Sequence, residues 1–135
     1  MTTKTILVVD NEEYIQEVIK ICLETTTKWQ VVTASSGNEG IKKAEIEKPD
    51  VILLDVMMPE IDGLTTFKYL QENPETKEIP VILLTAKVQT SDHQRYADLG
   101  MKATIPTTKP LGVIAKPFNP LELAIDIAKI LDWKE

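Results

Sequence analysis

The sequence is poor in the residues that small proteins use to cross-link a fold. Its 135 residues include one cysteine, Cys22, so no internal disulfide can form. Aromatic residues make up 5% of the chain, and there are 5 glycines against 43% hydrophobic residues. A chain of this length buries enough apolar surface to fold without disulfides or a structural metal. We therefore expect an ordinary globular domain, with Cys22 as a buried, unreactive thiol on a helix.

Long apolar segments and an excess of positive charge are also missing. No stretch is long enough for a signal peptide or a membrane span, so we expect a cytoplasmic protein with no membrane partner. Fifteen Lys and Arg against 21 Asp and Glu give a net charge of −6, which repels nucleic-acid phosphates. We expect no direct nucleic-acid binding. Acidic residues that converge would instead attract a cation.

Short apolar runs alternate along the chain with segments of helical periodicity. The runs read as strands buried on both faces and lie at residues 6–9, 51–54, 81–84 and 113–115, with 31–34 as a weaker fifth. Amphipathic helices are predicted at 14–23, 41–46, 64–70, 96–99 and 121–131, the last capped by Asn119 with Glu122 reaching back toward the cap. This alternation predicts an α/β fold, with a parallel sheet covered by helices on both faces.

Acidic residues follow two of the predicted strands immediately. Asp10 comes after the first run, and Asp55 comes after the run at 51–54. In such sheets the working crevice lies outside the carboxyl ends of the strands, so neighbouring strands would bring the two carboxylates together. Two packed carboxylates repel each other unless a cation or proton joins them. Mg²⁺ suits the place, because it prefers hard oxygen ligands and keeps several waters.

Two further strand ends carry groups suited to phosphate. Thr85 ends the run at 81–84 with a hydroxyl that could bind a phosphoryl oxygen, and Lys116 follows the last strand with an ammonium that could offset the new charge. Taken singly, an Asp after a strand is more often a helix cap or turn residue. The joint order of the four groups instead predicts attack of the Asp55 carboxylate on phosphorus, in line with the leaving group.

These residues stand in motifs that resemble those of a response-regulator receiver domain. The motifs are residues 6–12 (Ile-Leu-Val-Val-Asp-Asn-Glu), 53–63 (Leu-Leu-Asp-Val-Met-Met-Pro-Glu-Ile-Asp-Gly), 84–86 (Leu-Thr-Ala) and 116–118 (Lys-Pro-Phe). The resemblance covers nearly the whole chain. It implies a flavodoxin-like doubly wound fold of five strands, in the order 2-1-3-4-5, with five helices. It also implies a stand-alone receiver over residues 1–135, with no output domain.

The resemblance also assigns roles at the strand ends. It implies that Asp55 accepts a phosphoryl group from a sensor histidine kinase or a phosphotransfer protein. The receiver itself would catalyse this transfer and the later hydrolysis, without being an enzyme that acts on a separate substrate. Mg²⁺, or Mn²⁺, would be held by Asp10, Asp55 and the backbone carbonyl of Met57. Thr85 would be the switch hydroxyl and Lys116 the lysine of the family.

Two substitutions depart from the family pattern. The family usually has a second acid directly after the first, but here Asn11 offers a neutral carbonyl, which is a weaker Mg²⁺ ligand. We therefore expect weakened metal binding. The family often places an aromatic switch three residues before the lysine, whereas this chain has Val113, so the signal would pass mainly through Thr85.

The third departure is a long connection before the fifth strand. Residues 101–111 resemble an insertion, and Lys109 within them imitates the lysine-proline motif. Lys116 is preferred because residues 112–115 supply the strand that precedes it. In the family, the face of the fourth helix, fifth strand and fifth helix docks a downstream protein, so the insertion would lie close to a partner surface.

Other functions remain as alternatives. A degenerate receiver that has lost phosphorylation and acts only as an interaction module is the main rival, because of Asn11. A phosphohydrolase normally needs a second acid two residues after its nucleophile, where this chain has Met57. Nucleotide or flavin binding is disfavoured by the acidic turn at 10–13, which lacks the glycines of a phosphate cradle. The lone histidine, His93, is expected on a solvated helix surface.

Overall fold

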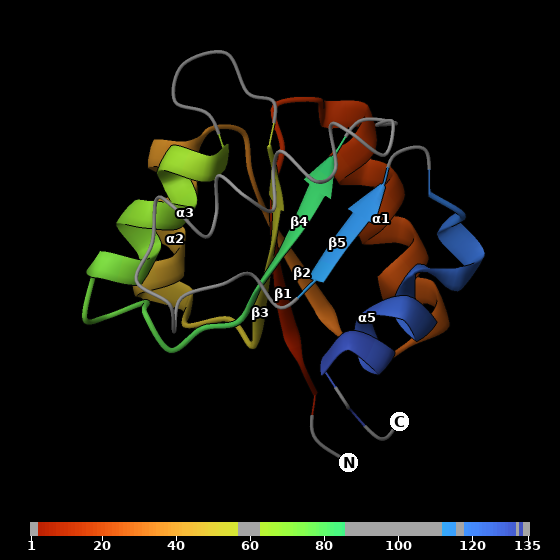
Figure 1. Ribbon diagram of the computed structural model, residues 1–135. Helices are drawn as coiled ribbons and strands as arrows, with labels where there is room; N and C mark the ends of the chain where they lie inside the picture. Colours follow the sequence, from red (N-terminus) through yellow and green to blue (C-terminus); the bar gives the residue numbers. More distant parts are fainter. Residues whose placement is uncertain (1–2, 57–62, 86–111, 116–117, 132, 134–135) are drawn as a thin grey trace.

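The computed structural model describes residues 3–56, 63–85, 112–115, 118–131 and 133. Five parallel strands form one sheet in the order β2-β1-β3-β4-β5. The strands are β1 (Thr5–Val9), β2 (Gln30–Ala34), β3 (Val51–Asp55), β4 (Val81–Thr85) and β5 (Gly112–Ala115). The predicted strands and their order are confirmed, with β2 and β5 at the two edges (Figure 1).

Alternate residues of the central strands enter two separate apolar layers. In β1, Ile6 and Val8 join the layer under one pair of helices, whereas Leu7 and Val9 join the layer on the opposite face. All four side chains are fully buried. Because both faces of the sheet are covered, these strands appear in the sequence as continuous apolar runs rather than as an alternation with polar residues.

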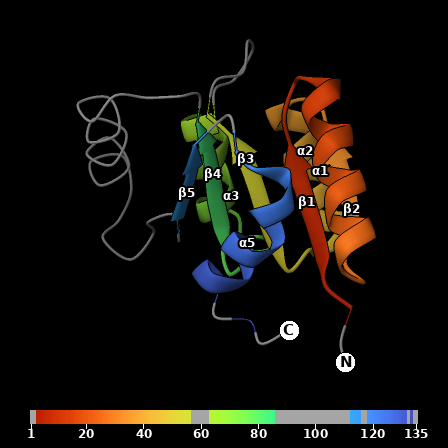
Figure 2. The same cartoon turned by 90° about the vertical axis from the view of Figure 1, so that its right-hand side faces the viewer.

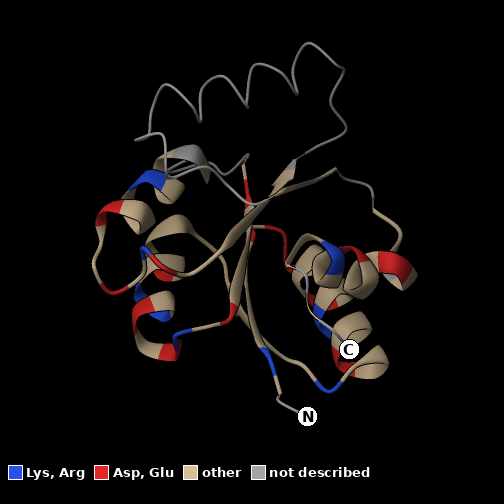
Figure 3. Ribbon diagram, turned by 60° about the horizontal axis from the view of Figure 1, so that its bottom comes forward, with Lys and Arg blue, Asp and Glu red and all other residues tan. Residues whose placement is uncertain are grey.

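Four α-helices cover the sheet in the described part of the chain. They are α1 (Glu13–Thr26), α2 (Gly37–Glu47), α3 (Gly63–Glu72) and α5 (Leu123–Leu131), with a short 3-10 helix, η1 (Pro120–Glu122), before α5. Helices α1 and α5 lie on one face and α2 and α3 on the other (Figures 1 and 2). Lys, Arg, Asp and Glu are interspersed on these helices, while the sheet is largely free of charge (Figure 3). The helix expected at 96–99 lies outside the described residues.

Helix ends depart from the sequence prediction in detail. Asn119 does cap the last helix, because its Oδ1 accepts from the Leu121 N–H at 2.9 Å. Glu122 reaches back to the side-chain amide of Asn119, at 3.3 Å, rather than to its backbone. The first turn is a 3-10 turn, which is common at helix ends. The α-helix therefore begins two residues later than the apolar period suggested.

Cys22 is half-buried, so the expectation of a fully buried thiol is wrong. The buried face of α1 is made by Gln16, Ile19 and Leu23, and Cys22 lies at its border. In the part of the chain that the structure describes, no helix has the length and apolar character needed to span a bilayer.

A carboxylate pair at the carboxyl edge of the sheet

Asp10 and Asp55 occupy neighbouring positions at the carboxyl edge of the sheet. Val9 pairs with Leu54, so the next residues along the parallel strands are Asp10 and Asp55. Adjacent strands lie about 4.8 Å apart. Asp10 is 0% exposed and Asp55 is 3% exposed, although both are acidic. The predicted convergence of the two acids at one edge is therefore present in the fold.

Three hydrogen bonds fix the loop that carries Asp10. Its N–H donates to the Ala34 carbonyl at 3.0 Å, which continues the pairing of β1 with β2. Its Oδ1 accepts from the Glu12 N–H at 2.9 Å, so one carboxylate oxygen is held by the turn that starts α1. Its backbone carbonyl accepts from the side-chain amide of Gln16. The direction of the carboxylate is thus set by local contacts.

Gln16 was not singled out by the sequence. It is 8% exposed and also donates to the Ser35 hydroxyl, at 3.1 Å, while its amide nitrogen lies 3.4 Å from the Ala34 carbonyl oxygen. The signal for it was a polar residue at helical spacing from Ile19 and Leu23, on the apolar face of α1. Such a residue must find hydrogen-bond partners when it is buried.

The backbone around Asp55 is held from two sides. Val56 N–H donates to the Leu84 carbonyl at 2.9 Å, which extends the pairing of β3 with β4. Gly63 N–H donates to the Val56 carbonyl, also at 2.9 Å. A Cβ added at Gly63 would lie 2.2 Å from the Asp55 carbonyl oxygen. Only glycine lets α3 start this close to the end of β3. The sequence hinted at this through the glycine that ends the motif at 53–63.

Comparison with known proteins identifies the family. The family model described as the response regulator receiver domain matches residues 6–128. The chain belongs to the response-regulator receiver family.

Relatives and a solved structure agree with this receiver assignment. The chain is 39% identical to the alkaline phosphatase synthesis transcriptional regulatory protein PhoP of Bacillus subtilis over 132 residues, which is 98% of this chain and 50% of PhoP. It is 32% identical to the polar-differentiation response regulator DivK of Brucella ovis over 111 residues, 82% of this chain and 88% of DivK. The chemotaxis protein CheY4 of Vibrio cholerae superposes with a TM-score of 0.79 at 26% identity, covering 96% and 99% of the two chains.

The chain spans about half the length of the transcriptional regulator that it matches. Against DivK, by contrast, the alignment covers most of the relative. The part that matches this chain is therefore about half of PhoP and most of DivK.

The remaining predicted site residues of the receiver are placed only in part. Thr85 is the last residue of β4 and pairs with Ala115, the last residue of β5, so both backbones end at the same edge as Asp55. Asn11 lies in an exposed bend directly after Asp10. The other predicted residues lie outside the described part of the chain: Met57, Lys116, His93, and the segment 101–111 with Lys109.

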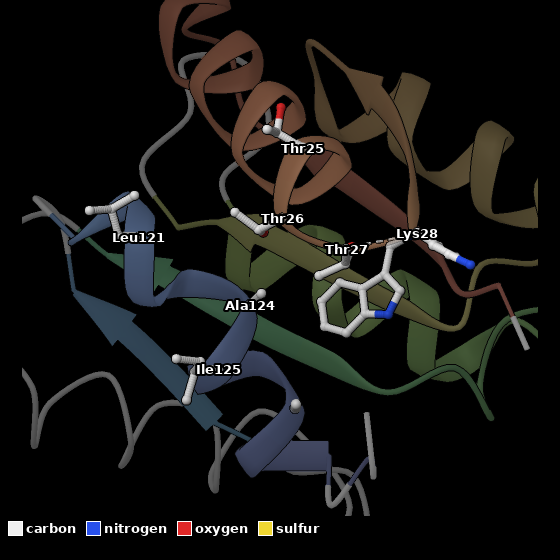
Figure 4. Close-up of a pocket in the computed structure, with 9 residues that line it drawn as sticks. Thr25, Thr26, Thr27, Lys28, Leu121, Ala124 and Ile125 are labelled. Atoms are coloured by element: carbon white, nitrogen blue, oxygen red, sulfur yellow. Dashed lines mark hydrogen bonds between the residues drawn. The ribbon is translucent and has the colours of Figure 1, made fainter. Parts of the chain in front are cut away.

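A cleft of about 630 Å³ lies elsewhere on the receiver, between the end of α1 and α5 (Figure 4). Its polar wall is Thr25, Thr26, Thr27 and Lys28, just before the amino end of β2, and its apolar wall includes Leu121 and Ile125. The hydroxyls of Thr26 and Thr27 donate to the Cys22 and Leu23 carbonyls, at 2.7 and 2.6 Å, and so close the end of α1. This cleft contains neither Asp10 nor Asp55 and is separate from the carboxylate pair.

Proposed function

We propose that this receiver accepts a phosphoryl group on Asp55 from a sensor histidine kinase or a phosphotransfer protein. The observation that carries the proposal is the burial of Asp10 and Asp55 side by side at the carboxyl edge of the sheet. Keeping two acids nearly free of solvent is costly for a protein that needs only a stable fold. A site that binds a cation and then phosphate gives both carboxylates a function.

The residues present fit a magnesium ion. Mg²⁺ is commonly bound by one or two carboxylates and completes its shell with water and phosphate oxygens. Asp10, Asp55 and the Met57 carbonyl would hold the ion, with Asn11 as a weak neutral ligand and Mn²⁺ as a substitute. When bound, the ion offsets the negative charge of the phosphoryl group.

In the phosphoryl transfer, the Asp55 carboxylate is the nucleophile. One of its oxygens attacks phosphorus, a new O–P bond forms, and the P–N bond of the donor phosphohistidine breaks in line with the attack. The Thr85 hydroxyl and the Lys116 ammonium would then bind the phosphoryl oxygens. Hydrolysis of the acyl phosphate by water returns Asp55 to its starting state, so the receiver would catalyse both steps on itself.

The output is proposed to be protein binding. The names of the relatives describe a transcriptional regulator and a regulator of polar differentiation, so receivers of this family serve different outputs. For this chain we propose a downstream protein target on the face that includes β5 and α5, without direct nucleic-acid binding by the receiver itself. The net charge of −6 supports the second part of this proposal.

The test is labelling with acetyl phosphate and Mg²⁺, read by intact-protein mass. We expect the native chain to gain one phosphoryl group that is lost at alkaline pH, and Asp55→Asn to gain none. Omission of Mg²⁺ should abolish labelling of the native chain. The rival interpretation, an interaction module without phosphorylation, predicts no labelling of either protein at any Mg²⁺ concentration. Circular dichroism of both proteins confirms that the comparison is made between folded chains.

A further inference from the structure

The apolar face of α1 contains one polar side chain that the proposed chemistry does not use. Gln16 is 8% exposed and shares its face with Ile19 and Leu23, which are fully buried. Burying a side-chain amide without hydrogen-bond partners would destabilise the fold by several kcal/mol. A leucine at this position would fill the layer at no such cost. The presence of glutamine at this position therefore indicates that its hydrogen bonds have a function.

These hydrogen bonds join two loops at the carboxyl edge of the sheet. The Gln16 amide donates to the backbone carbonyl of Asp10, in the loop between β1 and α1. It also donates to the Ser35 hydroxyl at 3.1 Å and lies 3.4 Å from the Ala34 carbonyl, where β2 passes into α2. One side chain thus bridges the acidic loop and the start of α2.

The second loop is itself firmly anchored. Ser36 caps α2, with its hydroxyl accepting from the Glu39 N–H at 3.1 Å. Glu39 returns the contact through Oε1, which accepts from the Ser35 N–H at 2.7 Å. Reciprocal bonds of this kind fix the start of a helix. The loop between β2 and α2, to which Gln16 donates, is therefore held in place by hydrogen bonds of its own.

We propose that Gln16 is a positioning residue for the phosphorylation site, which holds Asp10 in the direction needed to bind the divalent ion together with Asp55. The inference rests on the proposed function and adds to it a residue that touches neither ion nor phosphate. Groups that orient a metal ligand from behind typically change metal affinity by tenfold or more when removed. The reason is that a ligand already held in place loses less freedom when the ion binds.

The decisive variant is Gln16→Met, which keeps the length of the side chain and removes both donors. Mg²⁺ affinity is measured from the shifts of the backbone amides of residues 10–12 in ¹H–¹⁵N spectra, a readout that does not depend on phosphorylation. We expect the Kd for Mg²⁺ to rise about tenfold. The rate of labelling by acetyl phosphate should fall at low Mg²⁺ and return to the native rate at saturating Mg²⁺.

Thr76→Val is the matched control, because it removes the buried hydrogen bond from the hydroxyl of Thr76, which follows α3, to the Leu70 carbonyl and so weakens the fold without touching either loop that Gln16 joins. Its midpoint of unfolding should fall while its Mg²⁺ affinity stays native. If Gln16→Met binds Mg²⁺ as tightly as the native chain, or if both variants lose affinity in step with stability, Gln16 has only a structural role. If Gln16→Met does not fold, Gln16→Asn, which keeps the amide on a shorter arm, gives the same comparison.

Failure of this inference can be told apart from failure of the proposed function. A native chain that shows neither Mg²⁺-dependent shifts at residues 10–12 nor labelling on Asp55 would overturn the proposed function, and the role of Gln16 with it. A native chain that binds Mg²⁺ and is labelled, with Gln16→Met equal to it, would overturn only the role of Gln16.

Discussion

Two neighbouring residues of the acidic loop occupy opposite environments. Asp10 is 0% exposed and held at its N–H, its carbonyl and one carboxylate oxygen. Asn11 is exposed in the bend that follows. The family usually has acids at both positions, and this chain keeps the one that the fold holds rigidly. The loop therefore offers the proposed ion one buried carboxylate held by hydrogen bonds and one exposed neutral amide.

Placing a second acid at position 11 should strengthen the proposed metal site. For Asn11→Asp we expect the Kd for Mg²⁺ to fall several-fold, equivalent to about 1 kcal/mol, because an exposed charge close to the ion is still partly screened by water. Spectra of ¹⁵N-labelled protein during Mg²⁺ titration give the affinity. Gln30→Glu, at the exposed amino end of β2, adds the same charge far from the ion and should leave the affinity unchanged. An unchanged or weaker affinity in Asn11→Asp would contradict the prediction.

Gly63 should be the least replaceable glycine in the described part of the receiver. In Gly63→Ala, the added Cβ would meet the Asp55 carbonyl oxygen at 2.2 Å and the Val56 Cα at 2.6 Å, both of them backbone atoms. We expect a loss of about 3 kcal/mol in the free energy of unfolding, measured by urea denaturation. Gly40→Ala is the control: its nearest contact is the Val9 Cγ2 at 2.7 Å, a side-chain atom, so a smaller loss is expected. Equal losses would show that backbone crowding does not set the cost.

At the scale of the elements, the apolar pattern predicted the buried strands well and the partly exposed ends of strands and helices less well. The central strands β1 and β3 lie between two apolar layers, so every residue from Ile6 to Val9 had to be apolar. The edge strand β2 begins with exposed Gln30 and gave a weaker signal. Helix α1 extends to Thr26, beyond the last buried residue, Leu23, because hydroxyl bonds rather than apolar contacts close its end.

The candidate site, like the elements, could be predicted from the sequence only in part. The strand pattern placed Asp10 and Asp55 at the carboxyl ends of parallel strands, while the resemblance to the receiver family supplied the order that makes β1 and β3 neighbours. Gln16 could not be predicted, because its role depends on hydrogen bonds to a loop that is distant in sequence. The close contact that requires Gly63 is visible only once α3 is seen to start against the end of β3. A period of 3.6 residues places Gln16 on the buried face of α1 but names no partner for its amide.

Helix α2 should make the receiver sensitive to acid through its first turn. The Ser35 N–H, and to a lesser degree Lys43, holds the pKa of Glu39 below its usual value of 4.5. A carboxylate with a lowered pKa in the folded state stabilises the fold above its unfolded pKa, and this contribution is lost as the pH falls through the folded value. Because Glu39 is largely exposed, we expect less than about 1 kcal/mol.

The comparison is between the native chain and Glu39→Gln, with urea denaturation at a series of pH values from neutral to acidic. The native chain should be the more stable at neutral pH, and the difference should shrink on acidification below the usual pKa of a glutamate. A difference between native chain and Glu39→Gln that stays constant with pH would refute the assignment to ionised Glu39.

Over the whole molecule, the proposed phosphorylation site and a cluster of aromatic contacts lie at opposite ends of the strands. Asp10 and Asp55 are at the carboxyl edge, whereas Trp29 precedes β2 at the amino edge. The Trp29 and Trp133 rings meet edge to face, with centroids 5.2 Å apart and an angle of 84°. The Lys4 ammonium lies 4.9 Å from the centroid of the Trp133 ring. Residues before β1, before β2 and after α5 are thereby joined in one contact.

Removing this contact should therefore weaken the fold and spare the site. Trp133→Ala loses the ring pair, its apolar burial and the cation–π contact, and we expect a loss of about 2 kcal/mol in the free energy of unfolding. Trp133→Phe keeps a ring against Trp29 and should recover more than half of it. Near-ultraviolet circular dichroism reports the indole pair, and urea denaturation reports the stability. Because the parallel strands separate the two ends, Mg²⁺ affinity and labelling of Asp55 should match the native chain while the protein is folded. A change in Mg²⁺ affinity without unfolding would mean that the amino and carboxyl ends of the strands are coupled.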